Sequence, residues 1–303
     1  MAIKNYHRSV SFPIPSFTVV PRMNGKGSTS LPCRFSPFIS QLHDDIQSLN
    51  AWRRDPRSHF DPPSRICEAL ASLDRLHCSL LEDLLQHRKA REALARRSAS
   101  ADNLLEDFLH LAGAYSSFRS AIVVLKQEQS ATQAAIRRSD ASRIASRLRS
   151  QKKAEKELAK IASALRSTTT TTTTAKAGKL SPVSYTAEAE LEEILREVVT
   201  VTSEISSAVL GGIVRLSSAS YSPVGAQAHC EVVPMLRKLS SFSNKKDPTS
   251  KKEEGEEEKW NSALERLGTL EDFLVQVEAG CERLLRRLFN TRVFLLNVLT
   301  PSL

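Results

Sequence analysis

Several residue types that specialised sites require are scarce in this chain. The 303 residues include only 10 glycines and 6% aromatic residues, whereas alanine, leucine, arginine and glutamate are abundant. Low glycine content with many good helix formers favours helices. The cysteines are odd in number, form no CxxC pair and are typical of reduced thiols in an intracellular protein. They are Cys33, Cys67, Cys78, Cys230 and Cys281.

Long hydrophobic runs and catalytic motifs are also missing from the sequence. No window of about 18 residues is uniformly apolar, so we predict no transmembrane helix. There is no GxSxG or HExxH motif, and the NGKGST stretch at 24–29 lacks the first glycine of a phosphate-binding loop. His77–Cys78 and His229–Cys230 have no second ligand pair at zinc spacing. We therefore expect no enzyme activity, cofactor, metal site or small-molecule substrate.

Acidic residues are absent from the start of the chain, where the first is Asp44. Basic residues, serines and repeated prolines share this segment, and the prolines favour a disordered leader over residues 1–35. A targeting sequence within residues 1–43 is the alternative, because transit peptides share the acid-poor composition. We expect an intracellular, cytoplasmic protein, with peripheral membrane or organelle localisation left open.

Helical periodicity dominates the rest of the chain. Apolar residues recur at helical spacing over 37–52, 64–95, 101–138, 140–166, 186–219 and 260–298. We predict an all-α fold, namely an elongated antiparallel bundle of long, coiled-coil-like helices. A helical segment at 36–166 precedes a Thr-rich linker at 167–183, and a second segment at 184–303 packs with the first as one bundle. Residues 220–258 are expected to be a disordered insertion within it.

One pair of adjacent glycines and two single glycines within these helical patterns bear on the shape of the helices. Gly211 and Gly212 each cost about 1 kcal/mol relative to alanine in a helix interior. They indicate a kink or a close contact between helices. Gly268 and Gly280 lie off the apolar seam of the last helix and are expected to bend it.

The C-terminal stretch LLRRLFNTRVFLLNVLT, residues 284–300, is the most apolar of these segments. It has three interpretations: a membrane tail, a dimerisation zipper or the wall of an intramolecular core. Arginines interrupt it, which argues against a membrane tail. Leu285, Phe289, Leu296 and Leu299 widen the apolar stripe beyond the narrow seam of a zipper. Burial among several helices of one chain is the interpretation that we favour.

A basic segment is the candidate contact surface. Residues 137–166 contain ten basic and three acidic residues, a net charge of +7. Such a segment fits an anionic surface, although a solvated face of the bundle is the interpretation that we favour. The polythreonine run that follows removes the heptads of a basic leucine zipper. The candidate residues are Arg137, Arg138, Arg143, Arg147, Arg149, Lys152, Lys153, Lys156 and Lys160.

Three stretches resemble a known family. They are YHRSVSFP at 6–13, PFISQL at 37–42 and the C-terminal LLRRLFNTRVFLLNVLT. Together they are similar to the plant helical proteins catalogued as domain of unknown function 241, which are related to the BYPASS proteins. This resemblance implies a plant protein without catalytic activity, linked to root and shoot development through restraint of a mobile root-derived signal.

Two functions are therefore expected. The first is a non-enzymatic regulatory or interaction protein with an unidentified protein partner. The second is a peripheral membrane or adaptor protein that places the basic helix 137–160 against an anionic membrane. Nucleic acid is the weaker partner, because the basic segment lacks the zipper that would place it on DNA.

Overall fold

The computed structural model describes residues 36–55, 62–96, 98–174, 187–220 and 250–300. These residues form helices and turns without a strand, which confirms the all-α prediction. The helices are α1 (Ser36–Arg54), α2 (Pro63–Cys78), the π-helical η2 (Ser79–Leu84), α3 (Arg88–Arg96), α4 (Ser98–Arg137), α5 (Ala141–Thr174), α6 (Ala187–Ser220) and α8 (Ser250–Leu299). The predicted leader at 1–35 lies outside the described residues.

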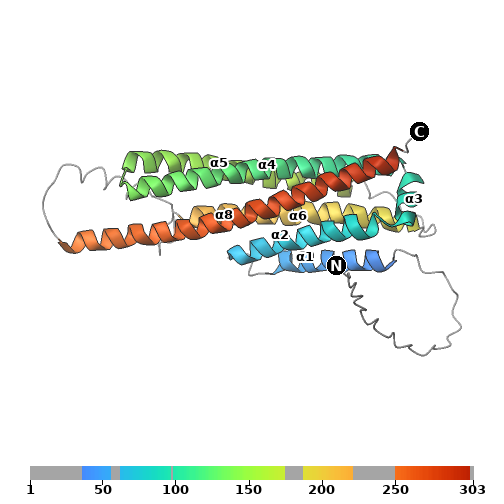
Figure 1. The fold of residues 1–303 in the computed structure, drawn as a ribbon, viewed down its shortest axis with the longest axis horizontal. Helices are drawn as coiled ribbons and strands as arrows, with labels where there is room; N and C mark the ends of the chain where they lie inside the picture. The colour runs from blue at the N-terminus through green and yellow to red at the C-terminus, as the bar shows by residue number, and fades with distance from the viewer. Residues whose placement is uncertain (1–35, 56–61, 97, 175–186, 221–249, 301–303) are drawn as a thin grey trace, which may run out of the picture. The chain divides into compact units, whose positions relative to one another are not determined.

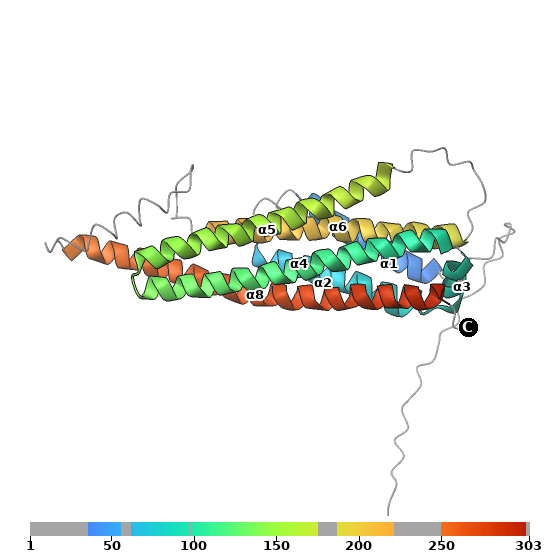
Figure 2. The same cartoon turned by 90° about the horizontal axis from the view of Figure 1, so that it is seen from above.

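The helices run side by side in one bundle (Figures 1 and 2). α6 contacts α1, α2, α3, α4, α5 and α8, so it lies at the centre. α4 and α5 form a hairpin, and α8 packs along α4 on one side and α2 on the other. The Cys281 Sγ lies 3.5 Å from the Tyr115 carbonyl oxygen, and the Gln129 side chain donates a hydrogen bond to the Leu267 carbonyl. These pairs show that α8 is antiparallel to α4.

The core consists mainly of side chains at the predicted apolar positions. Phe108, Tyr115 and Phe118 of α4 are almost completely buried, as are Leu284, Leu288 and Leu295 of α8. The C-terminal stretch therefore serves as a wall of an intramolecular core. The residues expected to widen this face are less buried: Leu285, Leu296 and Leu299 are partly buried, and Phe289 is 45% exposed.

The predicted single helix over 64–95 is interrupted, which corrects the sequence expectation. η2 follows α2, and the Leu85 amide donates to the Leu80 carbonyl five residues earlier at 3.0 Å. A π-helical turn rotates the side chains relative to a regular helix. Leu80, Leu81, Leu84 and Leu85 can therefore all be buried, after which the chain turns and begins α3.

Two predicted linkers are partly helical. α5 continues through the threonines to Thr174, so residues 167–174 of the predicted linker belong to a helix. α8 begins at Ser250, within the predicted insertion 220–258. Threonine costs only about 0.7 kcal/mol per residue in a helix, and extending an existing helix avoids the cost of a new nucleus. Residues 175–183 and 221–249 lie outside the described part of the chain.

Gly212 marks a close contact between helices. A Cβ on this residue would lie 2.7 Å from Cδ1 of Ile66 in α2. Gly280 of α8 similarly faces Leu70 of α2, at 3.4 Å from an added Cβ. Of the two explanations left open for the glycine pair, the structure supports close packing at Gly212.

Two helices are long and apolar enough to cross a membrane by length and composition alone, contrary to the sequence expectation. They span Asp102–Arg137 in α4 and Ala189–Ser220 in α6. Within the bundle, 44% and 67% of their most apolar windows are buried. Core helices of bundles meet the same criterion, and α6 is the central helix here.

Candidate functional site

All nine basic residues of the predicted contact surface are exposed. Arg137 ends α4, Arg138 lies in the turn that follows, and the other seven lie on α5. The turn is compact because Ser139 adopts a left-handed conformation, with φ of 52°. Asp140 then accepts a hydrogen bond from the Arg143 amide at 3.0 Å and caps the start of α5.

The geometry of α5 gathers five of the nine residues on one face. Each helical residue advances by about 100°, so residues spaced by three, four and seven share a side. The buried face includes Ile144, Ala154, Leu158, Ala162 and Leu165. The opposite face carries what we call the α5 basic stripe, which consists of Arg149, Lys152, Lys153, Lys156 and Lys160.

Buried polar contacts fix the rotation of α5 against α6. Glu155 is 9% exposed and accepts hydrogen bonds from Ser217 at 2.6 Å and Ser218 at 3.1 Å. Gln151 also donates to Ser217 at 2.8 Å. Farther along, Ser207 donates to the Ala162 carbonyl at 2.8 Å. These directional contacts hold the α5 basic stripe toward solvent.

Ion pairs separate the nine predicted basic residues into those held by an acidic neighbour and those that are not. Arg143 pairs with Asp140 at 3.1 Å, and Arg147 pairs with Glu128 of α4 at 3.3 Å. Both arginines therefore belong to the α4–α5 hairpin rather than to the stripe. Within the stripe, Lys160 pairs with Glu157 at 2.7 Å. Arg149, Lys152, Lys153 and Lys156 have no ion pair with any described residue.

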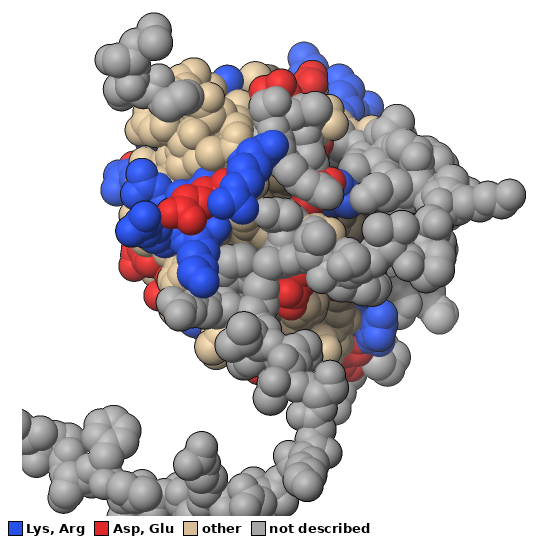
Figure 3. Space-filling view, turned by 90° about the vertical axis from the view of Figure 1, so that its right-hand side faces the viewer, with Lys and Arg blue, Asp and Glu red and all other residues tan. Residues whose placement is uncertain are grey.

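A second basic surface was missed by the sequence prediction. α3 buries Ala90, Ala93 and Leu94 against the bundle. Its outer face, here called the α3 basic surface, exposes Arg88, Lys89, Arg91 and Arg96. Figure 3 looks at this end of the bundle and shows a group of blue cationic side chains around a few red ones. The RKAREALAR sequence contains the signal, but the periodicity of residues 64–95 predicts it as the end of a longer helix.

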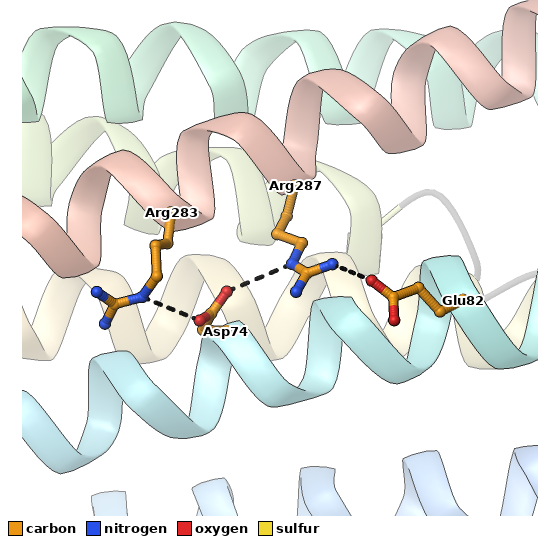
Figure 4. A network of polar contacts seen from close by, with 4 residues as sticks. All are labelled: Asp74, Glu82, Arg283 and Arg287. Carbon is orange, nitrogen blue, oxygen red and sulfur yellow. Dashed lines mark hydrogen bonds and ion pairs between the residues drawn. The ribbon is translucent and has the colours of Figure 1, made fainter. Parts of the chain in front are cut away.

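A polar network fastens α8 to α2 and η2 (Figure 4). Arg283 donates to Asp74 at 3.1 Å, and Arg287 lies 3.5 Å from the other oxygen of that carboxylate. Arg287 also donates to Glu82. This bond lowers the pKa of Glu82 and raises that of Arg287. Arg283 and Glu82 are exposed, whereas Asp74 and Arg287 are partly buried. The network pairs its own charges, so we assign it a structural role.

Among the histidines that the structure describes, His77 has the most perturbed pKa, and it lies in the core. It is fully buried, its Nε2 is 2.9 Å from Thr202 Oγ1, and its ring meets Phe108 edge to face. Thr202 donates its own hydrogen to the Val198 carbonyl at 2.6 Å, so it accepts from a protonated Nε2. Burial lowers the pKa of His77 to about 4, and Asp74 opposes the shift only partly.

Metal ligands are not assembled in the described part of the chain. No group of three or more histidine, cysteine or acidic residues there could hold an ion. His77 is separated from its neighbour Cys78, which is partly exposed, because it points into the core. Cys67, Cys78 and Cys281 are free thiols, and burial raises the pKa of Cys281 to about 12.

A groove of about 500 Å³ lies between α4, α5 and α6. Leu109, Ile161 and Val199 give it an apolar lining, and Asp107 and His110 lie along it. Burial raises the pKa of Asp107. The groove does not include any residue of the α5 basic stripe.

The comparisons with known proteins identify a family. The family model described as Protein BPS1 matches residues 69–298, which is well over half of the chain and includes both basic surfaces. A search of curated proteins and a search of solved structures found no match. The family match agrees with the resemblance carried by the C-terminal motif. The chain therefore belongs to the BPS1 family of plant proteins.

Proposed function

We propose that this protein is a non-enzymatic regulator of root and shoot development that binds an acidic protein partner through the α5 basic stripe. Membership of the BPS1 family supports a regulatory role in plants. The observation that carries the proposal is the stripe itself. Four of its cations have no ion pair with described residues, and buried hydrogen bonds hold their helix in a fixed rotation.

Electrostatic complementarity explains why such a stripe suits an acidic partner. A row of one charge sign on a rigid helix speeds encounter with the opposite charge and disfavours basic partners. The described part of α5 contains none of the large apolar side chains exposed elsewhere. Binding through this face therefore depends mainly on charge and weakens as salt screens the field.

Genetic complementation tests this proposal. A plant line lacking the protein would be transformed with the wild type, with K152E/K156E, or with R54E/R75E as a control of equal charge change. Arg54 and Arg75 are exposed residues on α1 and α2, away from the stripe. We expect the wild type and the control to restore root and shoot growth and K152E/K156E to fail at equal protein abundance.

Each alternative outcome overturns a separate part of the proposal. Normal growth of the line that lacks the protein would refute the developmental role. Full rescue by K152E/K156E would refute the role of the stripe. Circular dichroism of the purified variants would confirm that the substitutions leave the helices intact.

A second candidate function is peripheral membrane binding through the same stripe. The observation in its favour is that all nine predicted cations are exposed, as contact with anionic headgroups requires. Salt-sensitive cosedimentation with anionic vesicles that K152E/K156E abolishes would support it. Unchanged cosedimentation of that variant would exclude it.

A further inference from the structure

The end of the bundle where α3 meets the last turns of α8 combines cationic with exposed apolar side chains. We propose that this end docks on a membrane containing anionic phospholipids. The site goes beyond the proposed function, because it shares no residue with the α5 basic stripe and has a different partner. A protein held by this end would leave the stripe available to its protein partner.

The cationic half of the site is the α3 basic surface. α3 is a short amphipathic helix with four exposed cations and one acidic residue, Glu92, on its outer side. Arg88 pairs with Glu92 at 2.8 Å, yet its side chain remains 91% exposed. Lys89 has no ion pair with any described residue. Clusters of four or more basic residues on an amphipathic helix are typical of contact with anionic lipid.

The apolar half of the site belongs to α8. Phe289 and Val293 are 45% and 52% exposed, and they lie one helical turn apart. Arg286, also exposed, precedes Phe289 by three residues and extends the same face. Large apolar side chains exposed beside cations lose surface to water when they enter the headgroup and acyl boundary of a bilayer.

A direct contact joins α3 to the last turns of α8. The Arg91 guanidinium lies 5.8 Å from the ring centre of Phe294, which packs against the core. Phe294 lies about 100° around α8 from Val293 and about 140° from Phe289, so α3 packs on a neighbouring side of α8, and the cations and the exposed apolar pair belong to the same end of the bundle. Figure 3 shows the blue group at this end beside a surface of uncharged residues, which are drawn in tan.

The mixture of side chains decides between a membrane and a polyanion such as nucleic acid. Phosphate groups favour cations alone, and Phe289 can stack on a base, but exposed Val293 gains nothing from either contact. A bilayer offers both an anionic surface and an apolar layer beneath it. The α5 basic stripe, which lacks exposed large apolar residues, offers only the first kind of contact.

Vesicle flotation tests the proposal with the full chain. Vesicles would contain phosphatidylcholine alone, or phosphatidylcholine with about a third of phosphatidylserine. Each basic residue near an anionic leaflet strengthens binding by about fivefold. We expect R88Q/K89Q to weaken binding to the anionic vesicles by about 25-fold. The matched control K152Q/K153Q removes the same charge from the α5 basic stripe and should bind within about twofold of the wild type.

A second variant tests the apolar contribution. F289S/V293S keeps every charge, and both side chains are half exposed, so the fold should tolerate the change. We expect it to weaken binding at low salt, and to abolish the residual binding of the wild type at high salt, where charges are screened. Circular dichroism would verify the helical content of each variant.

The remaining outcomes would overturn the proposal. Failure of the wild type to float with anionic vesicles would exclude membrane docking. Equal losses for R88Q/K89Q and K152Q/K153Q would mean that net charge, and not this site, drives binding. A loss confined to K152Q/K153Q would move the membrane contact to the stripe, and would also contradict the assignment of the stripe to a protein partner.

Discussion

Acidification should destabilise this bundle through His77. The pKa of this histidine falls from 6.5 to about 4 on folding, because burial disfavours the charged ring. Above pH 6.5 the ring is neutral in both the folded and the unfolded state, so its titration does not change the free energy of unfolding. Below pH 6.5 the unfolded chain gains a proton that the folded protein rejects, so stability falls until the pH passes through about 4.

The size of the effect follows from the shift. Each pKa unit corresponds to about 1.36 kcal/mol, so the complete loss is about 3 kcal/mol. By about pH 5 this histidine has already lowered the free energy of unfolding by about 2 kcal/mol relative to neutral pH. A domain is stable by only about 5–15 kcal/mol, so this single side chain has a measurable influence.

Urea unfolding followed by far-ultraviolet circular dichroism can isolate this contribution. The wild type and His77→Leu would be compared at pH 7.5 and pH 5. Thr202 still donates to the Val198 carbonyl in the variant, so the cost at pH 7.5 should be about 1 kcal/mol. Carboxylates titrate alike in both proteins, and the difference between them reports His77.

We expect the wild type to lose about 2 kcal/mol more than His77→Leu between these two pH values. Identical losses in the two proteins would refute the reasoning. Such a result would mean that the ring accepts a proton in the folded state, through water or through movement toward Asp74.

Three other predictions concern single residues. Gly212→Ala should lower the free energy of unfolding by about 1–3 kcal/mol through overpacking against Ile66. Gly268→Ala has open space around the added Cβ and should raise it by up to about 1 kcal/mol. Equal effects of the two variants in urea unfolding would contradict the close contact at Gly212. Ser139→Gly should raise stability by about 0.5–1 kcal/mol, because glycine adopts the left-handed conformation without strain; thermal denaturation would reveal a loss if the serine side chain matters instead. In a variant that retains only Cys281, the buried thiol should resist a disulfide reagent at pH 8 and react fully in urea; rapid reaction of the folded protein would show that the core opens there.

The strongest helical patterns in the sequence predicted the fold well. The seam of α8 is apolar at nearly every buried position, and α6 buries many apolar residues beside its buried Thr and Ser side chains, so their periodicity identified both helices and the core. The second half of α4 was harder to interpret, because it buries Gln129, Thr132 and Gln133. Gln133 donates to Glu271 of α8 at 3.0 Å. A pattern based on apolar residues does not detect helix contacts made by buried amides.

The candidate surfaces were predicted less completely than the fold. Charge counting found the basic segment 137–160, but it could not separate the outward stripe from Arg147, which reaches Glu128 on another helix. α3 was hidden because a π-helical turn leaves no mark in composition. The leucines at 80, 81 and 84 in that turn, and Leu85 directly after it, fit a regular amphipathic helix almost as well. Surfaces made by two separate segments, such as α3 with α8, appear only once the chain is folded.

The position of α8 in the chain has a consequence for folding. Lys126 pairs with Glu278 at 2.6 Å and Asp74 with Arg283, across 152 and 209 residues of sequence. During synthesis α2 and α4 leave the ribosome well before α8, so the apolar faces that pack on α8 have no partner for that interval. Contacts of such long range slow folding and expose apolar surface to aggregation. Chaperone binding to nascent chains should therefore decline once residues 281–295 have emerged.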